Sequence, residues 1–327
     1  MDDIPIPVDP NSPGFLDQLR LFIRAQNKSY ATEKGYIGWC WRFICFHNKR
    51  SPRDMGAAEI EAFLSHLAVH KNVAISTQKT ALNALMFLFN QFLKKDVKDL
   101  VFNYAKLPRN IPVVFTHAEA CAVIGGLPAP YRLMASLMYG SGLRVSECVR
   151  LRVQDFDFGM NNLMIRNGKG NKSRITVLPE TLISDIRAQI DLVKAQHALD
   201  LKQGFGEVYM PHALARKYPS GARHLTWQYV FPAFHRAKDP RSDVMRRHHV
   251  MISTVQGRVA QAIREANILK KSGCHTFRHS FATRLLMKGY DIRTIQELLG
   301  HSDIRTTEIY LHVVRKGGRG VISPIDE

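Results

Sequence analysis

His275 and His279 lie four residues apart in the stretch CHTFRHSFAT, a spacing that allows two metal ligands on one face of a helix. The zinc-protease pattern HExxH requires a glutamate directly after the first histidine, where this chain has Thr276. A zinc site is therefore not expected. The two histidines around Arg278 must serve some other chemistry or a structural purpose.

Two further kinds of site are excluded by the residues they require. The loop NGKGNKS, residues 167–173, suggests a phosphate-binding loop, but neither glycine is followed by lysine and then serine or threonine, as GxxxxGK[ST] demands. A nuclease or transposase with two metal ions needs several carboxylates in one site. The acidic residues here instead occupy positions typical of helix caps and helix-surface pairs. We therefore predict no bound ATP, metal or other cofactor.

The remaining polar residues favour phosphoryl transfer without a metal. A phosphate that is being transferred gathers negative charge on its nonbridging oxygens, and two guanidinium groups can bind that charge. Arg144 and Arg278 fit this role. Imidazoles exchange protons near neutral pH, and a lysine can protonate a leaving oxygen. The candidates for these roles are His275, His301 and Lys169.

Such a reaction also needs a nucleophile, and Tyr310 is the candidate. With an ordinary pKa of about 10, tyrosine is a weak nucleophile unless neighbouring cations stabilise its phenolate, as this group of cations would. Taken singly, each residue also has an ordinary structural explanation: Arg144 as a surface cation, His301 as a partner of a helix end, Tyr310 as a core ring. Their order and local sequence must distinguish the two interpretations.

The composition indicates the class of partner. The 327 residues include 46 Lys and Arg against 28 Asp and Glu, a net charge of +18, which favours nucleic acid over an acidic membrane surface. The start, MDDIPIPVDPNSPGF, lacks the basic and apolar regions of a signal peptide, and no apolar run approaches about 18 residues. The five cysteines are scattered, as in reduced proteins. We expect a folded cytoplasmic protein, associated with the bacterial nucleoid and with no membrane partner.

The first hundred residues have the periodicity of amphipathic helices. Apolar residues recur at helical spacing in four stretches between residues 15 and 92. Ser12 and Pro13 occupy cap and first-turn positions for the first of these helices. We predict a small helical bundle, a domain of residues 12–98, whose aromatic residues pack in its core rather than stack on bases.

A charged segment with two prolines, residues 94–115, ends this periodicity, and Thr116 with Glu119 forms a capping box for a new helix. In the second domain, residues 112–327, helical spacing is interrupted by NNLMIRNGKGNKSRITVLP, which predicts two short strands around a Gly/Asn turn. The predicted fold class is mainly α (α+β). It has a helical N-terminal domain and a mostly helical second domain with a small antiparallel sheet.

Four motifs in sequence order, GSGLRVSE, GKGNKSR, HTFRHSFAT and LLGHSDIRTTEIYLHV, resemble those of the tyrosine recombinases, the phage integrase family. The resemblance covers nearly the whole chain, because the family also has an N-terminal helical core-binding domain of the SAM-like type that clamps DNA. It implies a site-specific recombinase that needs no ATP or metal. It also implies a homotetramer on DNA, in which the tail of residues 317–327 docks on a neighbouring protomer.

The resemblance implies a catalytic set of Arg144, Lys169, His275, Arg278, His301 and Tyr310. The two arginines would bind the phosphate, and Tyr310 would form a 3′-phosphotyrosyl bond. Lys169 would protonate the departing 5′ oxygen, with the neighbouring Lys172 as the alternative acid. His279 has no assigned catalytic role in the family and is interpreted as structural.

Residues 211–249 exceed what the family requires. They include eight Lys and Arg against two Asp, and five histidines. Long insertions are usually functional or disordered, and the aromatic residues here argue against disorder, although a basic surface flap remains an alternative. The stretches KYP, WQYVFP and SDVMRRHH resemble the added segment of integron integrases. By that resemblance, an insertion at about 200–249 would contact DNA through Trp227, Arg246, Arg247, His248 and His249.

The favoured function is therefore an integron integrase, which integrates and excises gene cassettes. That subfamily acts on a double-stranded platform site and on folded single-stranded cassette sites with protruding bases. One alternative is an ordinary double-strand recombinase of the phage or chromosome-dimer-resolving type, against which the basic insertion argues. Another is a catalytically silent DNA-binding protein, against which the complete residue set argues. A type IB topoisomerase would share the chemistry but lack the insertion.

Overall fold

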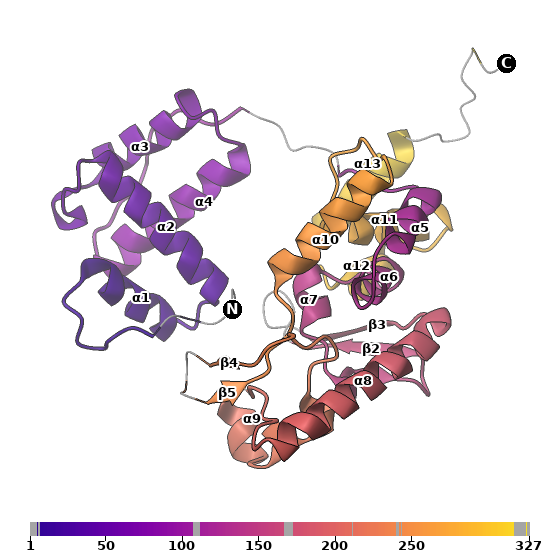
Figure 1. The fold of residues 1–327 in the computed structure, drawn as a ribbon. Coiled ribbons are helices and arrows are strands. Elements are labelled where there is room, and N and C mark those ends of the chain that lie inside the picture. The colour runs from indigo at the N-terminus through magenta and orange to yellow at the C-terminus, as the bar shows by residue number, and fades with distance from the viewer. Residues whose placement is uncertain are drawn as a thin grey trace. The chain divides into compact units, whose positions relative to one another are not determined.

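The computed structural model describes residues 5, 7–106, 112–166, 173–210, 212–239, 242, 244–316 and 325. The chain divides into two compact units (Figure 1). The described part of the first unit ends at Lys106, and that of the second begins at Pro112. No helix in these ranges is long and apolar enough to cross a membrane.

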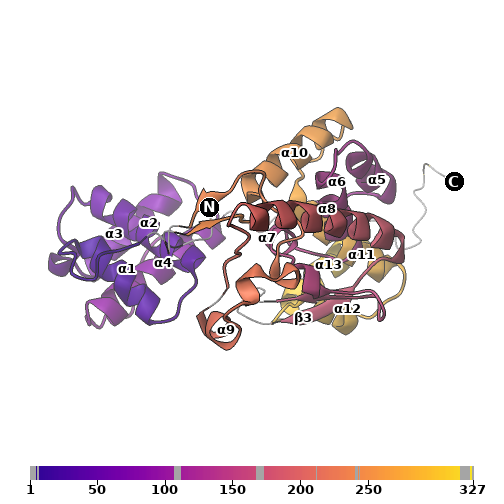
Figure 2. The same cartoon turned by 60° about the horizontal axis from the view of Figure 1, so that its bottom comes forward.

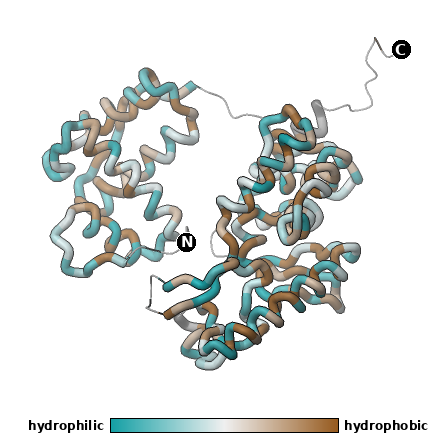
Figure 3. Tube along the Cα trace, in the orientation of Figure 1, coloured by the Kyte–Doolittle hydropathy of each residue, from teal (hydrophilic) through white to brown (hydrophobic). Residues whose placement is uncertain are grey.

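The N-terminal unit is a helical bundle. Its helices are α1 Phe15–Ala25, α2 Tyr30–Phe46, α3 Ala57–Val69 and α4 Ile75–Met86, with the turn η1 Pro52–Asp54 and the π-helical end η2 Phe87–Phe92. Three buried rings meet edge to face at its centre, with Phe43 centred 5.6 Å from Phe63 and 5.8 Å from Phe89. The prediction that these aromatic residues form a core is confirmed. Figure 3 shows apolar and polar positions interspersed along these helices.

The start of the first helix differs from the prediction. The helix begins at Phe15 with Gly14 at the N-cap, so Ser12 and Pro13 precede it. The Ser12 hydroxyl donates instead to the Asp17 carboxylate at 2.9 Å and accepts from the Gly14 N–H. A carboxylate in the first turn thus competes successfully for the hydroxyl that was expected to cap the helix.

The second unit is mainly helical and contains a small antiparallel sheet with the order β1-β2-β3. The strands are β1 Phe156–Asp157, β2 Asn162–Ile165 and β3 Arg174–Val177. Two of the three are the predicted pair; the turn between them lies outside the described residues. The predicted capping box is also present, since the Thr116 and Glu119 side chains each accept from the other's backbone N–H.

The helices of the second unit are α5 His117–Gly125, α6 Tyr131–Gly140, α7 Val145–Val149, α8 Ile183–Lys202, α9 His212–Lys217, α10 Ile252–Glu265, α11 Cys274–Met287, α12 Ile292–Leu299 and α13 Arg305–Lys316.

Helix α11 packs against α6, α12 and α13 (Figure 2). Its buried Phe277 belongs to the main hydrophobic core, and Phe281 belongs to a second, smaller cluster that includes Tyr310. A helix buried along most of its length holds its polar residues in fixed positions. The stretch CHTFRHSFAT forms the first ten of the 14 residues of α11.

The basic insertion is folded wherever the structure describes it. After the long helix α8 come α9, the 3₁₀ turns η5 Gly221–Arg223 and η6 Leu225–Trp227, and the hairpin of β4 Ala237–Lys238 with β5 Met245–Arg246. In Figure 1, α9 and the hairpin lie near the C-terminal end of α8. The side chains of Val230 and Phe231 are buried in the main core, and the Val230 N–H donates to the Leu151 carbonyl at 2.9 Å. The insertion is therefore anchored to the core of the unit.

Candidate active site

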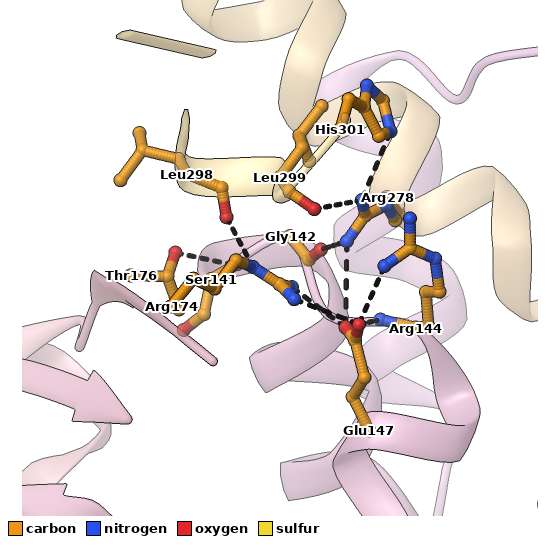
Figure 4. Close-up of polar contacts among 10 residues, drawn as sticks. All are labelled: Ser141, Gly142, Arg144, Glu147, Arg174, Thr176, Arg278, Leu298, Leu299 and His301. Atoms are coloured by element: carbon orange, nitrogen blue, oxygen red, sulfur yellow. Dashed lines mark hydrogen bonds and ion pairs between the residues drawn. The ribbon is translucent and has the colours of Figure 1, made fainter. Parts of the chain in front are cut away.

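One carboxylate binds three arginines at the centre of the site (Figure 4). Glu147, on α7, accepts two hydrogen bonds from Arg174, at 2.9 and 2.8 Å, and one from Arg144 at 2.7 Å. The Arg278 Nη1 atom lies 3.6 Å from the same carboxylate. Glu147 also accepts from the Arg144 backbone N–H, which fixes it to the start of its own helix. Residues from α7, β3 and α11 are thereby joined through one side chain.

The neighbouring arginines keep the Glu147 carboxyl ionised. Burial alone would raise the pKa of its carboxyl, but the hydrogen bonds and charge of Arg174, the Arg144 N–H and the charge of Arg278 outweigh this and lower it to about 2. The carboxylate therefore stays ionised at neutral pH. Three guanidiniums against one carboxylate leave the cluster with a net positive charge, which suits an anionic phosphate.

Arg278 lies deeper than its position on the helix suggested. Its side chain is 1% exposed, whereas His275, three residues earlier, is exposed. The guanidinium donates to the backbone carbonyls of Gly142, at 2.6 Å, and Leu299. Burial lowers the pKa of Arg278, and the charge of Arg144 lowers it further, to about 9, so the group is still protonated at neutral pH. Arg278, which was predicted to bind the phosphate, therefore lies beneath the surface on which His275 is exposed.

Two motif glycines make this burial possible. Gly142 and Gly300 have φ angles of +65° and +63°, in the left-handed region that glycine adopts without strain. A Cβ on Gly142 would lie 2.5 Å from a ring carbon of Phe281, and one on Gly300 would lie 2.7 Å from the Arg174 Cδ. The turns of GSGLR and LLGH can therefore approach α11 and β3 closely only with glycine at these positions.

His301 is neutral and has a defined tautomer. Arg278 Nη2 lies 3.2 Å from His301 Nε2, and because arginine can only donate, Nε2 must accept. The ring proton then lies on Nδ1, which donates to the Thr307 hydroxyl at 2.9 Å. Burial lowers the pKa of His301, and the charges of Arg278 and Arg144 lower it further, to about 3.

The tyrosine hydroxyl is covered and hydrogen-bonded. Tyr310 is 2% exposed, and its Oη lies 2.9 Å from Nδ1 of His279. Its ring is also stacked at an interplanar angle of 18° with that of His301, with centroids 6.4 Å apart. The His279 ring is in turn in edge contact with the exposed His275, at 4.7 Å between centroids. A line of contacts therefore leads from the surface at His275 to the buried hydroxyl.

The structure brings together Arg144, His275, Arg278, His301 and Tyr310. Lys169 and the alternative Lys172 lie outside the described residues. Sequence reasoning did not select Glu147, Arg174 or His279, although each lies within a quoted motif. The available signal was the excess of arginines in those motifs, since a buried group of cations requires a carboxylate. Within the described ranges no group of three or more His, Cys, Asp or Glu side chains is placed to hold a metal ion.

The predicted DNA-binding residues of the insertion have a different arrangement. Arg247 makes a two-pronged ion pair with Asp200 at the end of α8, at 2.7 and 2.9 Å, and Arg246 binds Asp239 at 2.9 Å. His248 and His249 are 9% and 6% exposed and pack against the ring of Tyr229. All four side chains therefore make contacts within the insertion, and their contact with DNA stays a prediction.

Trp227 is partly exposed, as are Arg246 and Arg247. Its backbone carbonyl accepts from Arg152 at 2.6 Å, and the Arg152 guanidinium lies over its ring at 5.5 Å. Phe234, which the sequence analysis did not select for DNA contact, is 88% exposed. The insertion therefore presents at its surface the Trp227 ring, held by Arg152, and the exposed rings of Tyr218 and Phe234.

Comparison with known proteins identifies the class. The chain matches the phage integrase family over residues 113–316 and the N-terminal SAM-like domain of phage integrases over residues 15–99. An integrase/recombinase of Escherichia coli is 45% identical over 312 residues, which cover 95% of this chain and 93% of that protein. The tyrosine recombinase XerD of Lacticaseibacillus casei is 31% identical over 270 residues, covering 80% and 79% of the two chains.

A solved structure of the XerH site-specific recombinase, bound to palindromic difH substrate in a post-cleavage complex, has a similar fold. Its TM-score is 0.59 at 19% identity, covering 93% of this chain and 83% of that one. Together these likenesses define an enzyme of the tyrosine recombinase class, whose members cleave and rejoin DNA through a phosphotyrosine intermediate. The chain belongs to the phage integrase family, and the predicted fold class is confirmed.

Proposed function

We propose that this chain is a site-specific DNA recombinase in which Tyr310 is the nucleophile. The observation that carries the assignment is the place of its hydroxyl, beside His279 and His301 and within the electrostatic reach of Arg278 and Arg144. Burial raises the pKa of Tyr310, while the charges of Arg278 and Arg144 act to lower it. Once phosphate binds, those cations would stabilise the developing negative charge.

The proposed reaction conserves the energy of the phosphodiester. Tyr310 Oη attacks the phosphorus and forms the O–P bond, while the bond from phosphorus to the 5′ oxygen breaks. Lys169 is proposed to protonate that oxygen. Arg144, whose side chain is 18% exposed, and the exposed His275 would meet the phosphate first. Arg278 and His301 would act from below the surface, as charge and as hydrogen-bonding support.

Because Tyr310 is 2% exposed, DNA binding must be coupled to a movement that uncovers its hydroxyl. The tyrosine is on α13, the last described helix. Residues 317–324, in the tail that follows, lie outside the described residues. We propose that this tail docks on a neighbouring protomer in a homotetramer on DNA, which would couple uncovering of the tyrosine to assembly.

DNA is the proposed partner for two reasons. The net charge of +18 favours a polyanion, and XerH, which has a similar fold, was captured on its difH substrate. A protein of this kind would work in the cytoplasm, on the bacterial nucleoid.

We propose further that the enzyme is an integron integrase. The support is the insertion at about 200–249, which the Arg247–Asp200 pair and the buried segment at Val230 hold as a folded part of the unit. A rigid basic insertion with aromatic rings at its surface suits recognition of bases that protrude from a folded single strand. It would act on such cassette sites as well as on a double-stranded platform site.

A second candidate function is that of an ordinary double-strand recombinase, which the 31% identity to a XerD protein favours. The two differ in the DNA that they prefer. An integron integrase should bind a folded single-stranded cassette site more tightly than the corresponding perfect duplex, whereas an ordinary recombinase should prefer the duplex. A competition binding assay at fixed salt distinguishes them.

The Tyr310→Phe variant tests the recombinase assignment. It removes only the hydroxyl, so DNA binding should persist while the covalent complex disappears. Denaturing gels of a nicked suicide substrate measure the adduct. Tyr290→Phe is the matched control, because Tyr290 is an exposed tyrosine outside the site. A phosphotyrosyl adduct recovered from Tyr310→Phe would remove the nucleophile assignment.

A further inference from the structure

His279 was interpreted as structural, yet it makes a direct hydrogen bond to the proposed nucleophile. Its Nδ1 lies 2.9 Å from Tyr310 Oη, and the two ring centroids are 5.5 Å apart. A group that accepts a proton in the transition state must lie within about 2.6–3.2 Å of the atom that loses it. The distance between these two atoms in the resting site already lies within that range.

The surroundings keep His279 neutral before DNA arrives. Burial lowers the pKa of His279, and the charges of His275 and Arg278 lower it further, to about 4. Burial also raises the pKa of Tyr310, against the opposing charges of Arg278 and Arg144. In the resting site the proton therefore stays on the tyrosine. A neutral imidazole with its own proton on Nε2 presents an unprotonated Nδ1 to the hydroxyl.

A bound phosphodiester shifts this balance toward proton transfer. Its negative charge offsets the nearby guanidiniums, which removes part of the repulsion that a protonated His279 would experience. As the bond from Oη to phosphorus forms, the phenol becomes much more acidic. Both changes favour passage of the proton from Oη to His279 Nδ1, which lies 2.9 Å away.

We propose that His279 is a catalytic residue, the general base that removes the phenolic proton of Tyr310. The inference rests on the proposed role of Tyr310 as the nucleophile. In cleavage, the O–H bond of Tyr310 breaks, its proton passes to His279 Nδ1, and the 5′ oxygen receives a different proton from Lys169. In rejoining, the imidazolium returns its proton to the departing phenolate, so protons balance over both steps.

His279→Asn provides the first test, since an asparagine oxygen near the Nδ1 position can accept the hydrogen bond but cannot take the proton. Cleavage of a suicide substrate should slow by about 100-fold to 10,000-fold, the usual contribution of general-base catalysis. DNA affinity and the melting temperature should remain near those of the wild type. With 3,5-difluorotyrosine at position 310, a more acidic phenol, much of the lost rate should return in His279→Asn.

Two comparisons separate this role from a structural one. A substrate with sulfur in the 5′ bridging position needs no leaving-group protonation, so it should rescue Lys169→Ala but not His279→Asn. A second variant, His279→Ala, should regain activity with added imidazole. The alternative is that the hydrogen bond only holds Tyr310 in its buried position. In that case His279→Asn will cleave at the wild-type rate or faster, and neither the more acidic phenol nor imidazole will increase the rate. This result overturns the inference.

The outcome for Tyr310→Phe distinguishes the two proposals. If that variant still forms the adduct, the nucleophile assignment fails, whatever His279 does. If it is inactive while His279→Asn cleaves normally, the nucleophile assignment stands and only the general base is rejected.

Discussion

At the scale of single residues, the charge of the site depends on Glu147. Three arginines close together repel one another, and each loses hydration when it is buried. A carboxylate that binds Arg144 and Arg174 directly and lies 3.6 Å from Arg278 offsets that cost. Removing the carboxylate would leave the three cations uncompensated, so Glu147 should matter to folding before it matters to catalysis.

The Glu147→Gln variant should therefore be less stable than the wild type. Its free energy of unfolding should also lack the pH dependence that the Glu147 carboxyl causes. A carboxyl whose pKa falls from an ordinary 4.5 to about 2 on folding contributes about 3 kcal/mol. Because the folded pKa is the lower one, this contribution is complete above about pH 4.5 and disappears as the pH falls toward 2. Hydrogen exchange of the α7 and α11 amides between pH 6 and pH 2.5 measures it.

The control for this measurement is Glu265→Gln, at the exposed end of α10. It should leave protection of α7 and α11 unchanged across the pH range. Equal protection of these helices in Glu147→Gln and the wild type at pH 6 would mean that the arginines do not depend on the carboxylate.

Residue type and spacing predict only part of the site. Residue type and motif order selected Arg144, Arg278, His301 and Tyr310, which the structure brings together. Spacing along a helix gives direction around its axis but not depth beneath neighbouring elements. Arg278 therefore proved to be buried under the turns at Gly142 and Leu299. The hydrogen bond from Tyr310 to His279 joins residues 31 positions apart, and no local pattern indicates it.

At the scale of elements, helix periodicity and strand alternation predicted the helices and the β2–β3 pair because these depend on local sequence. The insertion could not be interpreted in the same way. Its short run RRHH looked like a cationic surface, yet Arg247 pairs with Asp200, 47 residues earlier, and His249 packs on Tyr229. Long-range partners decide whether a cation is a surface group or a structural one.

The turn at Gly142, which packs closely against α11, should tolerate no larger residue. Gly142→Ala requires a left-handed backbone at alanine, which costs roughly 1–2 kcal/mol, in addition to the clash 2.5 Å from Phe281. It should also displace the carbonyl that binds Arg278, so cleavage should fall together with the melting temperature. Calorimetry and a suicide-substrate assay measure the two effects.

Gly257→Ala is the matched control. Gly257 lies within α10, and a Cβ there would have no neighbour within 4 Å. Alanine in a helix interior is more favourable than glycine by roughly 0.5–1 kcal/mol, so this variant should be slightly more stable and fully active. If Gly142→Ala behaved in the same way, the close approach of the GSGLR turn to α11 would have no role in building the site.

At the scale of the whole molecule, the net charge of +18 explains attraction to any DNA but not the choice of one. Arg246, Arg247, His248 and His249 make contacts within the insertion, so we expect selectivity to depend mainly on the aromatic rings at its surface. Trp227 is partly exposed, and its backbone is fixed by Arg152. A ring held in place before binding loses less entropy when a base stacks on it.

The final prediction concerns the coupling between Trp227 and a protruding base. If the insertion captures such bases, Trp227→Ala should lose about 1–3 kcal/mol of affinity for a hairpin that carries one, the usual contribution of base stacking on an aromatic ring. A hairpin without that base should bind the variant and the wild type equally. Phe234→Ala, at the 88% exposed ring, is the comparison variant and should show the smaller coupling, because a more exposed ring loses more freedom on binding.

A packing role for Trp227 predicts the opposite pattern. Loss of the ring would then disturb its contacts with Arg152 and Tyr218 and weaken binding to every DNA equally, including perfect duplex. The double-mutant comparison of protein change against base deletion isolates the coupling energy from such general damage. Zero coupling at both Trp227 and Phe234, in variants with wild-type melting temperatures, would favour the ordinary double-strand recombinase, because neither of these rings would then recognise an unpaired base.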